Sequence, residues 1–321
     1  MKNLPILIII LVLIPALIMA QDGDYKVPTE LNVEDFQMPA DKEFLEKFDG
    51  IKIPMLMQKV IKTEEEYIIP WLRQKTADVR DYELTISVMR QGVLVTDKQF
   101  PHVKAAVDAC AEILRLSPPP RVFIVGTGGM KAGAVNFKEP FILLPAELVE
   151  KSNVKALRFA IGRQIGHIKC DHVFYRSLTS GGLDSLEFAL GKWVQELIKS
   201  FFGKIGDLVL VDWKLASEIS ADRAGLIACQ DLDVAQNMLL NFKLAMPVEE
   251  VKLNVEDYLN QAAVIQEKQG LILENMPGAV QEGINRWQRS NRLASAHPFI
   301  FQRIKALQEY ARSDAYRKLF E

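Results

Sequence analysis

The residues from Asn153 to Asp171 constrain the fold most strongly, because they have the spacing of a long amphipathic helix that begins at an asparagine cap. Apolar side chains that recur every three or four residues form its core face: Leu157, Ile161, Ile165 and Ile168. A different face carries Arg163 and His167 beside Ala156 and Ala160, whose small side chains let another element approach closely. The pattern predicts a buried helix with polar residues on a second packed face.

This helix contains an altered metal-binding motif. Two histidines four residues apart can hold one metal ion, and a glutamate between them can take a proton from metal-bound water. Here the pentapeptide reads Arg163-Gln-Ile-Gly-His167, so only the second histidine is present. Arg163 has no lone pair for a metal. Gln164 can orient a water but cannot act as a base.

A second helix is predicted from about Trp213 to Gln230, with acidic residues on one face. Glu218 and Asp222 lie on that face beside Gly225. Carboxylates next to an apolar surface are costly to bury unless a cation accompanies them. We therefore expect these two residues to meet a positive charge.

Composition excludes some classes of protein. A chain of 321 residues with 49% apolar and 25% charged residues can bury a sizeable core, as one large domain with appendages or as two domains. The net charge is −2 and no block of Lys and Arg stands out, so no nucleic-acid partner is expected. Cys110, Cys170 and Cys229 are expected to be buried thiols, with one disulfide and a spare thiol as the alternative.

The N-terminal segment predicts export. Lys2 precedes an uncharged apolar run over residues 4–20, which is typical of a cleaved signal peptide, with an uncleaved N-terminal anchor as the alternative. Either outcome predicts a periplasmic or extracellular location. The chain divides into residues 1–20 as signal peptide or anchor, 21–80 as N-terminal tether and helical segment, and 81–321 as the main domain.

The remaining segments indicate a mainly α protein of the α+β class. Residues 21–40 are polar and indicate a tether, and residues 53–74 have helical spacing that Pro70 must bend or end. Further along the chain we expect a helix over 102–116, strands at 121–125 and 140–144, and a loop over 126–133. Residues 185–210 are apolar but carry charges, which favours a lid or core helix. In one interpretation this helix contacts a membrane surface.

Three blocks, in this order, resemble the HtpX and CAAX-prenyl-protease family of gluzincin zinc metallopeptidases: Phe159–His172, Ser217–Gly225, and Ala296-His-Pro298 with Arg303-Ile304. The likeness covers roughly residues 99 to 307. It implies the gluzincin metallopeptidase fold, with a small sheet and an active-site helix, for residues 81–321. In that family two histidines and a glutamate bind zinc, the helix glutamate is the base, and a later His-Pro histidine lies near the substrate.

Carried over residue by residue, the resemblance assigns retained metal-ligand positions to His167 and Glu218, and a substrate-groove position to His297. Arg163 replaces the first ligand and Gln164 replaces the base. Residues 131–134 also depart from the substrate-holding strand of relatives. These changes predict a pseudopeptidase without a metal cofactor. The alternative is an active metalloendopeptidase with a non-standard zinc site, and a third reading is a structural membrane-associated protein.

Antiparallel packing of the two helices, which the resemblance implies, predicts an ion-pair cluster of Arg163, Glu218 and Asp222 where the family holds its metal. A rearranged site of His167, Cys170, His172 and Glu218 is an alternative. However, His172 is expected to point away from His167, because five residues separate them on a helix. The expected partner is a peptide or protein segment that adds a strand to the sheet edge, with a membrane surface as a further contact.

Overall fold

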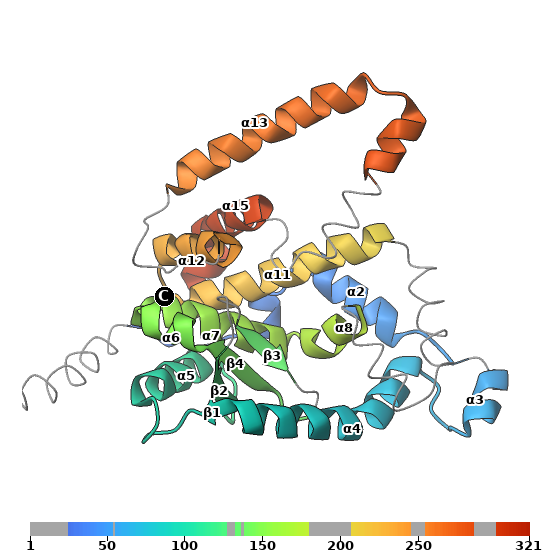
Figure 1. Cartoon of the computed structure of the whole chain (residues 1–321), viewed down its shortest axis with the longest axis vertical. Coiled ribbons are helices and arrows are strands. Elements are labelled where there is room, and N and C mark those ends of the chain that lie inside the picture. The colour runs from blue at the N-terminus through green and yellow to red at the C-terminus, as the bar shows by residue number, and fades with distance from the viewer. Residues whose placement is uncertain are drawn as a thin grey trace, which may run out of the picture.

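The computed structural model describes residues 25–321 apart from 54, 127–131, 136–137, 180–206, 245–253 and 286–299. Helices make up most of it, and a small mixed sheet lies along one side (Figure 1). This confirms the α+β, mainly α class. The elements before the sheet's second strand are η1 (Val33–Asp35), α2 (Pro39–Asp49), α3 (Met55–Ile61), α4 (Ile68–Gln91), β1 (Gly92–Leu94) and α5 (Pro101–Ile113). The later elements are β2 (Arg121–Val125), β3 (Gly133–Val135), β4 (Phe141–Pro145), α6 (Ala146–Lys151), α7 (Val154–Lys169), α8 (His172–Thr179), α11 (Asp207–Cys229), α12 (Leu232–Leu244), α13 (Val255–Glu274), α15 (Ile300–Arg312) and α16 (Asp314–Lys318).

The sheet has the strand order β1-β2-β4-β3. β2 pairs with β4 in parallel, with Phe123 opposite Leu143, whereas β1 and β3 pair antiparallel to their neighbours. The apolar runs of β2 and β4 are mostly buried, as parallel strands covered by helices usually are. This confirms both strands predicted from the sequence, and it leaves β3 at an edge that lies next to α7.

Helices α7 and α11 form the centre of the core and run antiparallel. A Cβ at Gly162 would lie 2.5 Å from the Cβ of Ala228, and a Cβ at Gly166 would lie 2.6 Å from that of Ala224. Because no side chain fits there, the two backbones approach closely. The predicted helix is confirmed, with Asn153 accepting a hydrogen bond from the Ala156 N–H at 2.9 Å. The small residues at this approach include Gly162 and Gly166 of α7 and Ala224 and Ala228 of α11.

Part of the expected N-terminal tether packs against the domain. Leu31 and Phe36 are buried in the main core, and Tyr310 donates a hydrogen bond to the Asp35 carbonyl at 2.8 Å. The described part of the expected tether therefore packs on the domain. Two apolar side chains and backbone hydrogen bonds suffice to hold a short segment on a large domain. The mainly polar composition of this segment therefore did not predict the packing.

The expected helix over 53–74 is two helices. α3 ends at Ile61, and α4 begins at Ile68 and continues to Gln91, past residue 80. Pro70 lies in the first turn of α4 rather than breaking a longer helix. A proline is tolerated there because the N–H groups of the first turn have no intrahelical partner.

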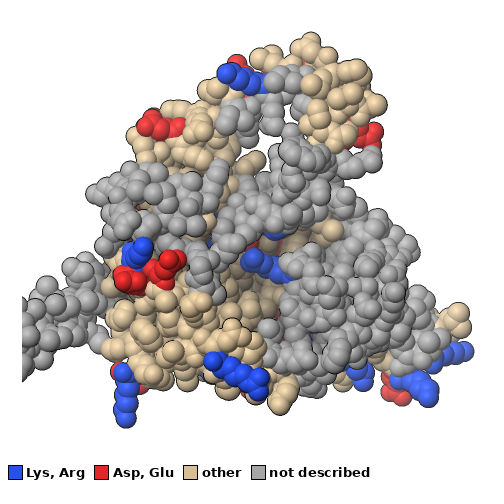
Figure 2. Space-filling model, viewed as in Figure 1, with Lys and Arg blue, Asp and Glu red and all other residues tan. Residues whose placement is uncertain are grey.

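Lys, Arg, Asp and Glu residues are dispersed over the described surface in the view of Figure 2. α13 extends away from the other helices (Figure 1). No helix among the described residues is both long and apolar enough to cross a membrane. The expectations for residues 1–20, for most of 185–210 and for His297 fall outside the described residues. The three cysteines are buried free thiols, which confirms that expectation.

Candidate functional site

The structure brings together four of the residues singled out from the sequence. Arg163 and His167 of α7 face Glu218 and Asp222 of α11. Each of the four side chains is at most 4% exposed. At this depth an unpaired charge would cost several kcal/mol, on the order of the effective penalty for one desolvated ion. The charges must therefore compensate one another.

Arg163 bridges the two acidic residues. Its Nε donates to Asp222 Oδ1 and its Nη2 donates to Glu218 Oε2, each at 2.6 Å. Its guanidinium also lies 5.6 Å from the ring centre of Phe242. Arg163 thus binds both carboxylates at once, as a planar guanidinium fork can.

Two further arginines complete the cluster. Arg303 of α15 donates through Nε and Nη2 to the two oxygens of Asp222, both at 2.7 Å, and its Nη1 lies 3.1 Å from Glu218 Oε2. Arg176 of α8 places its Nη1 3.3 Å from Glu218 Oε1. Burial by itself would raise the pKa of Glu218, but Arg303, Arg176 and Arg163 hold that pKa well below its usual value. Glu218 is therefore an ionised carboxylate at neutral pH.

A chain of hydrogen bonds connects this cluster to α2. Arg176 Nη1 can only donate, so His167 Nε2 accepts from it at 2.7 Å. His167 then carries its proton on Nδ1 and donates to His172 Nδ1 at 2.9 Å. His172 Nε2 donates to Asp41 Oδ2 at 2.7 Å. Burial and the nearby Arg176 keep the pKa of His167 well below its ordinary value, which agrees with a neutral ring.

The expectation that His172 points away from His167 is wrong. It assumed one continuous helix, but α7 ends at Lys169 and Asp171 adopts a left-handed conformation with φ of 58°. The chain turns there, and α8 returns His172 to within hydrogen-bonding distance of His167. The contact between His167 and His172 therefore exists because α7 ends before His172.

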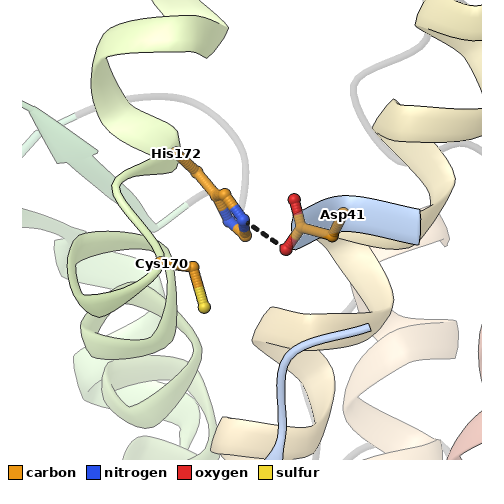
Figure 3. Close-up of side chains that lie close together, drawn as sticks. All are labelled: Asp41, Cys170 and His172. Atoms are coloured by element: carbon orange, nitrogen blue, oxygen red, sulfur yellow. Dashed lines mark hydrogen bonds and ion pairs between the residues drawn. The ribbon is translucent and has the colours of Figure 1, made fainter. Parts of the chain in front are cut away.

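Asp41, Cys170 and His172 form a second buried group of metal-ligand types, with one potential ligand atom from each within 4.8 Å of the others. Figure 3 shows the His172 ring directed at the Asp41 carboxylate, with Cys170 beside them. Asp41 also accepts hydrogen bonds from Trp213 Nε1 at 3.0 Å and Ser220 Oγ at 2.9 Å. Burial raises the pKa of the Cys170 thiol well above its ordinary value. Hydrogen bonds thus already satisfy the carboxylate and imidazole of this group.

Gln164 lies at the position of the base and contacts the sheet. Its side-chain oxygen accepts a hydrogen bond from the Ala134 N–H on β3 at 3.0 Å. The side chain is 2% exposed. The residue at the base position therefore fastens the edge strand to α7.

Asp41 and Arg176 were not identified from the sequence, and no role was assigned to Arg303. Asp41 follows a polar stretch without periodicity, and Arg176 lies on a separate helix. Arg303 belongs to the third block of the resemblance, so its sequence context offered a signal. His297 cannot be located relative to the site, since it lies outside the described residues.

The residues at the position that the resemblance assigns to the metal do not fit zinc. Catalytic zinc usually has three protein ligands with lone pairs, whereas Arg163 replaces one of them. The oxygens of Glu218 accept from arginines, and Arg176 covers the Nε2 lone pair of His167. This donor set is arranged for guanidinium groups.

A small mixed sheet, two central antiparallel helices and an altered His-x-x-x-His helix define a metallopeptidase-like fold. Residues 97–311 match the sequence profile of peptidase family M48, and because this is more than half of the chain, the chain belongs to that family. It is 23% identical over 303 residues to the plastoglobule-localized metallopeptidase 48, chloroplastic, of Arabidopsis thaliana, covering 91% of this chain and 76% of that protein. No solved structure matches the chain at a significant level. The family match confirms the resemblance seen in the sequence.

Proposed function

We propose that this member of the M48 family is a pseudopeptidase, which keeps the peptidase fold and binds peptide or protein segments without cleaving them. The observation that carries the proposal is the position of Arg163, whose guanidinium binds both Glu218 and Asp222. A metal ion at this position would have to displace three arginines from two carboxylates. The permanent charge of arginine replaces the charge that a metal would supply.

The second support comes from Gln164. Metallopeptidase chemistry of this class needs a group that takes a proton from the attacking water, and an amide does not titrate. The Gln164 oxygen is engaged by the Ala134 N–H, which ties it to the sheet. The loss of the base therefore does not depend on whether any metal binds.

The sheet edge is the proposed binding surface for an extended segment. In an antiparallel ladder, the N–H and C=O of one residue point to the same side. Since the Ala134 N–H points to Gln164, away from β4, the Ala134 C=O also points away from β4. This carbonyl can accept a hydrogen bond from an added strand.

The apolar run over residues 4–20 supports an exported, periplasmic or extracellular protein, and a membrane surface is a further proposed contact.

The competing function is an active metalloendopeptidase with a rearranged zinc site. Two observations favour it: membership of the M48 family and the nearby group of Asp41, Cys170 and His172. Under this alternative, zinc would be the cofactor and the site would use ligands other than those of the family pattern. The two functions predict different metal contents and different activities.

Elemental analysis of the purified full chain, combined with casein hydrolysis with and without a chelator, tests the proposal. We expect substoichiometric zinc and no chelator-sensitive cleavage. Stoichiometric zinc together with cleavage that a chelator abolishes would show an active peptidase. The binding half is tested separately by titrating the protein with an immobilised library of extended peptides, where binding without cleavage is the expected result. Retention of none of the peptides would refute the sheet edge as a binding surface.

A further inference from the structure

A surface pocket lies where α4 passes the start of β2. The helix packs against β1 and β2, and the segment that leads into β4 closes the other side. The volume of the pocket is about 340 Å³, which is within the range of roughly 300–1,000 Å³ that small-molecule sites occupy. α4 contributes Asp81, Tyr82 and Ile86 to its wall, and the sheet side contributes Arg121, Lys138 and Glu139.

The charges of the described wall residues are balanced. Arg121 and Lys138 are basic, whereas Asp81 and Glu139 are acidic. A wall of one sign would attract ligands of the opposite sign, but a balanced wall favours neither a simple anion nor a simple cation. Two opposite charges on one ligand can each find a partner in such a pocket.

One ion pair in the wall can exchange its partners. Arg121 and Glu139 are 3.1 Å apart, and their side chains are 41% and 79% exposed. An exposed pair of this kind contributes little to stability, so a ligand can separate it at low cost. A zwitterion that does so gives each of the two residues a new partner, whereas a singly charged ligand gives a partner to only one.

The opposite side of the pocket is held in position. Asp81 Oδ2 accepts a hydrogen bond from the Lys138 backbone N–H at 2.8 Å, which joins α4 to the sheet side. Tyr82 follows it on the helix and is 69% exposed. A tyrosine ring offers apolar surface to a side chain and attracts an ammonium group to its face. Ile86 adds apolar surface to the same wall.

We propose that this pocket binds a zwitterion of amino-acid or dipeptide size. The guanidinium of Arg121 takes the carboxylate, for which its paired N–H donors are suited. Asp81 and Glu139 take the ammonium group, and Tyr82 and Ile86 contact an apolar side chain. A free amino acid and a short peptide share this chemistry. The pocket shares no residue with the ion-pair cluster, so the proposal stands whether or not the protein cleaves peptides.

Calorimetric titration of the full chain with leucine and with the dipeptide Ala-Leu tests the ligand class. The acetylated form of each compound lacks the ammonium group, and the amide of each lacks the carboxylate. We expect leucine, Ala-Leu or both to bind, and each blocked form to bind at least tenfold more weakly than its parent. Which of the two parents binds identifies the source as a free amino acid or a short peptide.

Two variants test the location of the site. Arg121→Gln and Asp81→Asn should each weaken binding at least tenfold, and the asparagine keeps an oxygen for the Lys138 N–H. Glu139→Gln replaces Asp81→Asn should that variant fail to fold. Arg317→Gln is the matched control, because its pair with Asp314 is also exposed and lies outside the pocket.

Three results would overturn the proposal. The first is that neither leucine nor Ala-Leu binds. The second is that a blocked form binds as well as its parent, since a single charge would then suffice. The third is that a folded pocket variant binds as tightly as Arg317→Gln, since the ligand would then lie elsewhere.

Discussion

The Nε atom of Arg163 lies 2.6 Å from Oδ1 of Asp222, between the packed faces of α7 and α11. This contact joins a residue that cannot bind a metal to a carboxylate that is 0% exposed. The pair is held in place by Arg303, which contacts both oxygens of the same carboxylate. Stability of the core therefore depends on charge compensation at the position where the family resemblance puts the metal.

Substitution Arg163→Met should destabilise the protein strongly. It removes the guanidinium and both of its 2.6 Å hydrogen bonds to the buried Glu218 and Asp222, so we expect a loss of about 3–5 kcal/mol in the free energy of unfolding. Urea denaturation measures this. Arg121→Met is the control, because its ion pair with Glu139 is exposed and should contribute less than about 1 kcal/mol. Equal losses for the two variants would show that the buried cluster is not structural.

Restoring Arg163→His and Gln164→Glu should not restore tight zinc binding. Arg176 would still donate to the Nε2 lone pair of His167, and Arg303 would still bind Glu218 and Asp222. Competition with a chromophoric chelator should show weak binding in the double variant. Adding Arg176→Gln should strengthen binding by at least tenfold, since it frees one ligand atom. Tight zinc binding by the double variant would contradict this.

Substitution Asp41→Asn should separate α2 from the site. An amide offers one oxygen where the carboxylate accepts from His172, Ser220 and Trp213. We expect a loss of about 2–4 kcal/mol, the scale for breaking a buried charged hydrogen-bond group. The fluorescence of Trp213 should also change. Glu43→Gln on the same helix is the control, because its pair with Lys47 is exposed.

Ionisation of the Cys229 thiol should make the stability of the protein depend on pH in the alkaline range. Burial raises the pKa of this thiol to about 12, from an ordinary value of 9.0. Between these two values the unfolded chain has lost the proton and the folded chain has kept it, so stability falls as pH rises. The penalty approaches about 1.4 kcal/mol per pH unit above pH 9. With rising pH, the free energy of unfolding of the original chain should therefore fall relative to that of Cys229→Ala, which has no thiol to ionise at this position. A difference that stays constant from pH 8 to pH 10.5 would rule this out.

Substitution Gly162→Ala should disrupt the packing of α7 on α11. The added Cβ would lie 2.5 Å from the Cβ of Ala228, and overpacking of this kind costs about 1–3 kcal/mol. Gly283→Ala is the matched control, since it is a helical glycine whose Cβ would meet no atom within 4 Å. That change should be neutral or stabilising by about 0.5–1 kcal/mol. Thermal unfolding of the two variants makes the comparison, and an equally stable Gly162→Ala would mean that the helices can separate at little cost.

Periodicity and motifs that are local in the chain were sufficient to predict the helix from Asn153, the strands at 121–125 and 140–144, and the family. The sequence also predicted that Arg163 should meet Glu218 and Asp222, since two buried carboxylates require a cation. That inference combined the chemistry of the three side chains with the antiparallel packing of the two helices that the family resemblance implies.

The identity of the other groups in the site depends on how the helices pack in three dimensions. Arg176 and Asp41 come from separate helices, and their contacts with His167 and His172 follow from a left-handed turn at Asp171 that helical periodicity did not predict. The docking of residues 25–40 was likewise decided by packing on a distant surface. Such contacts depend on where the chain reverses direction, and a local pattern of residue types carries little information about that position.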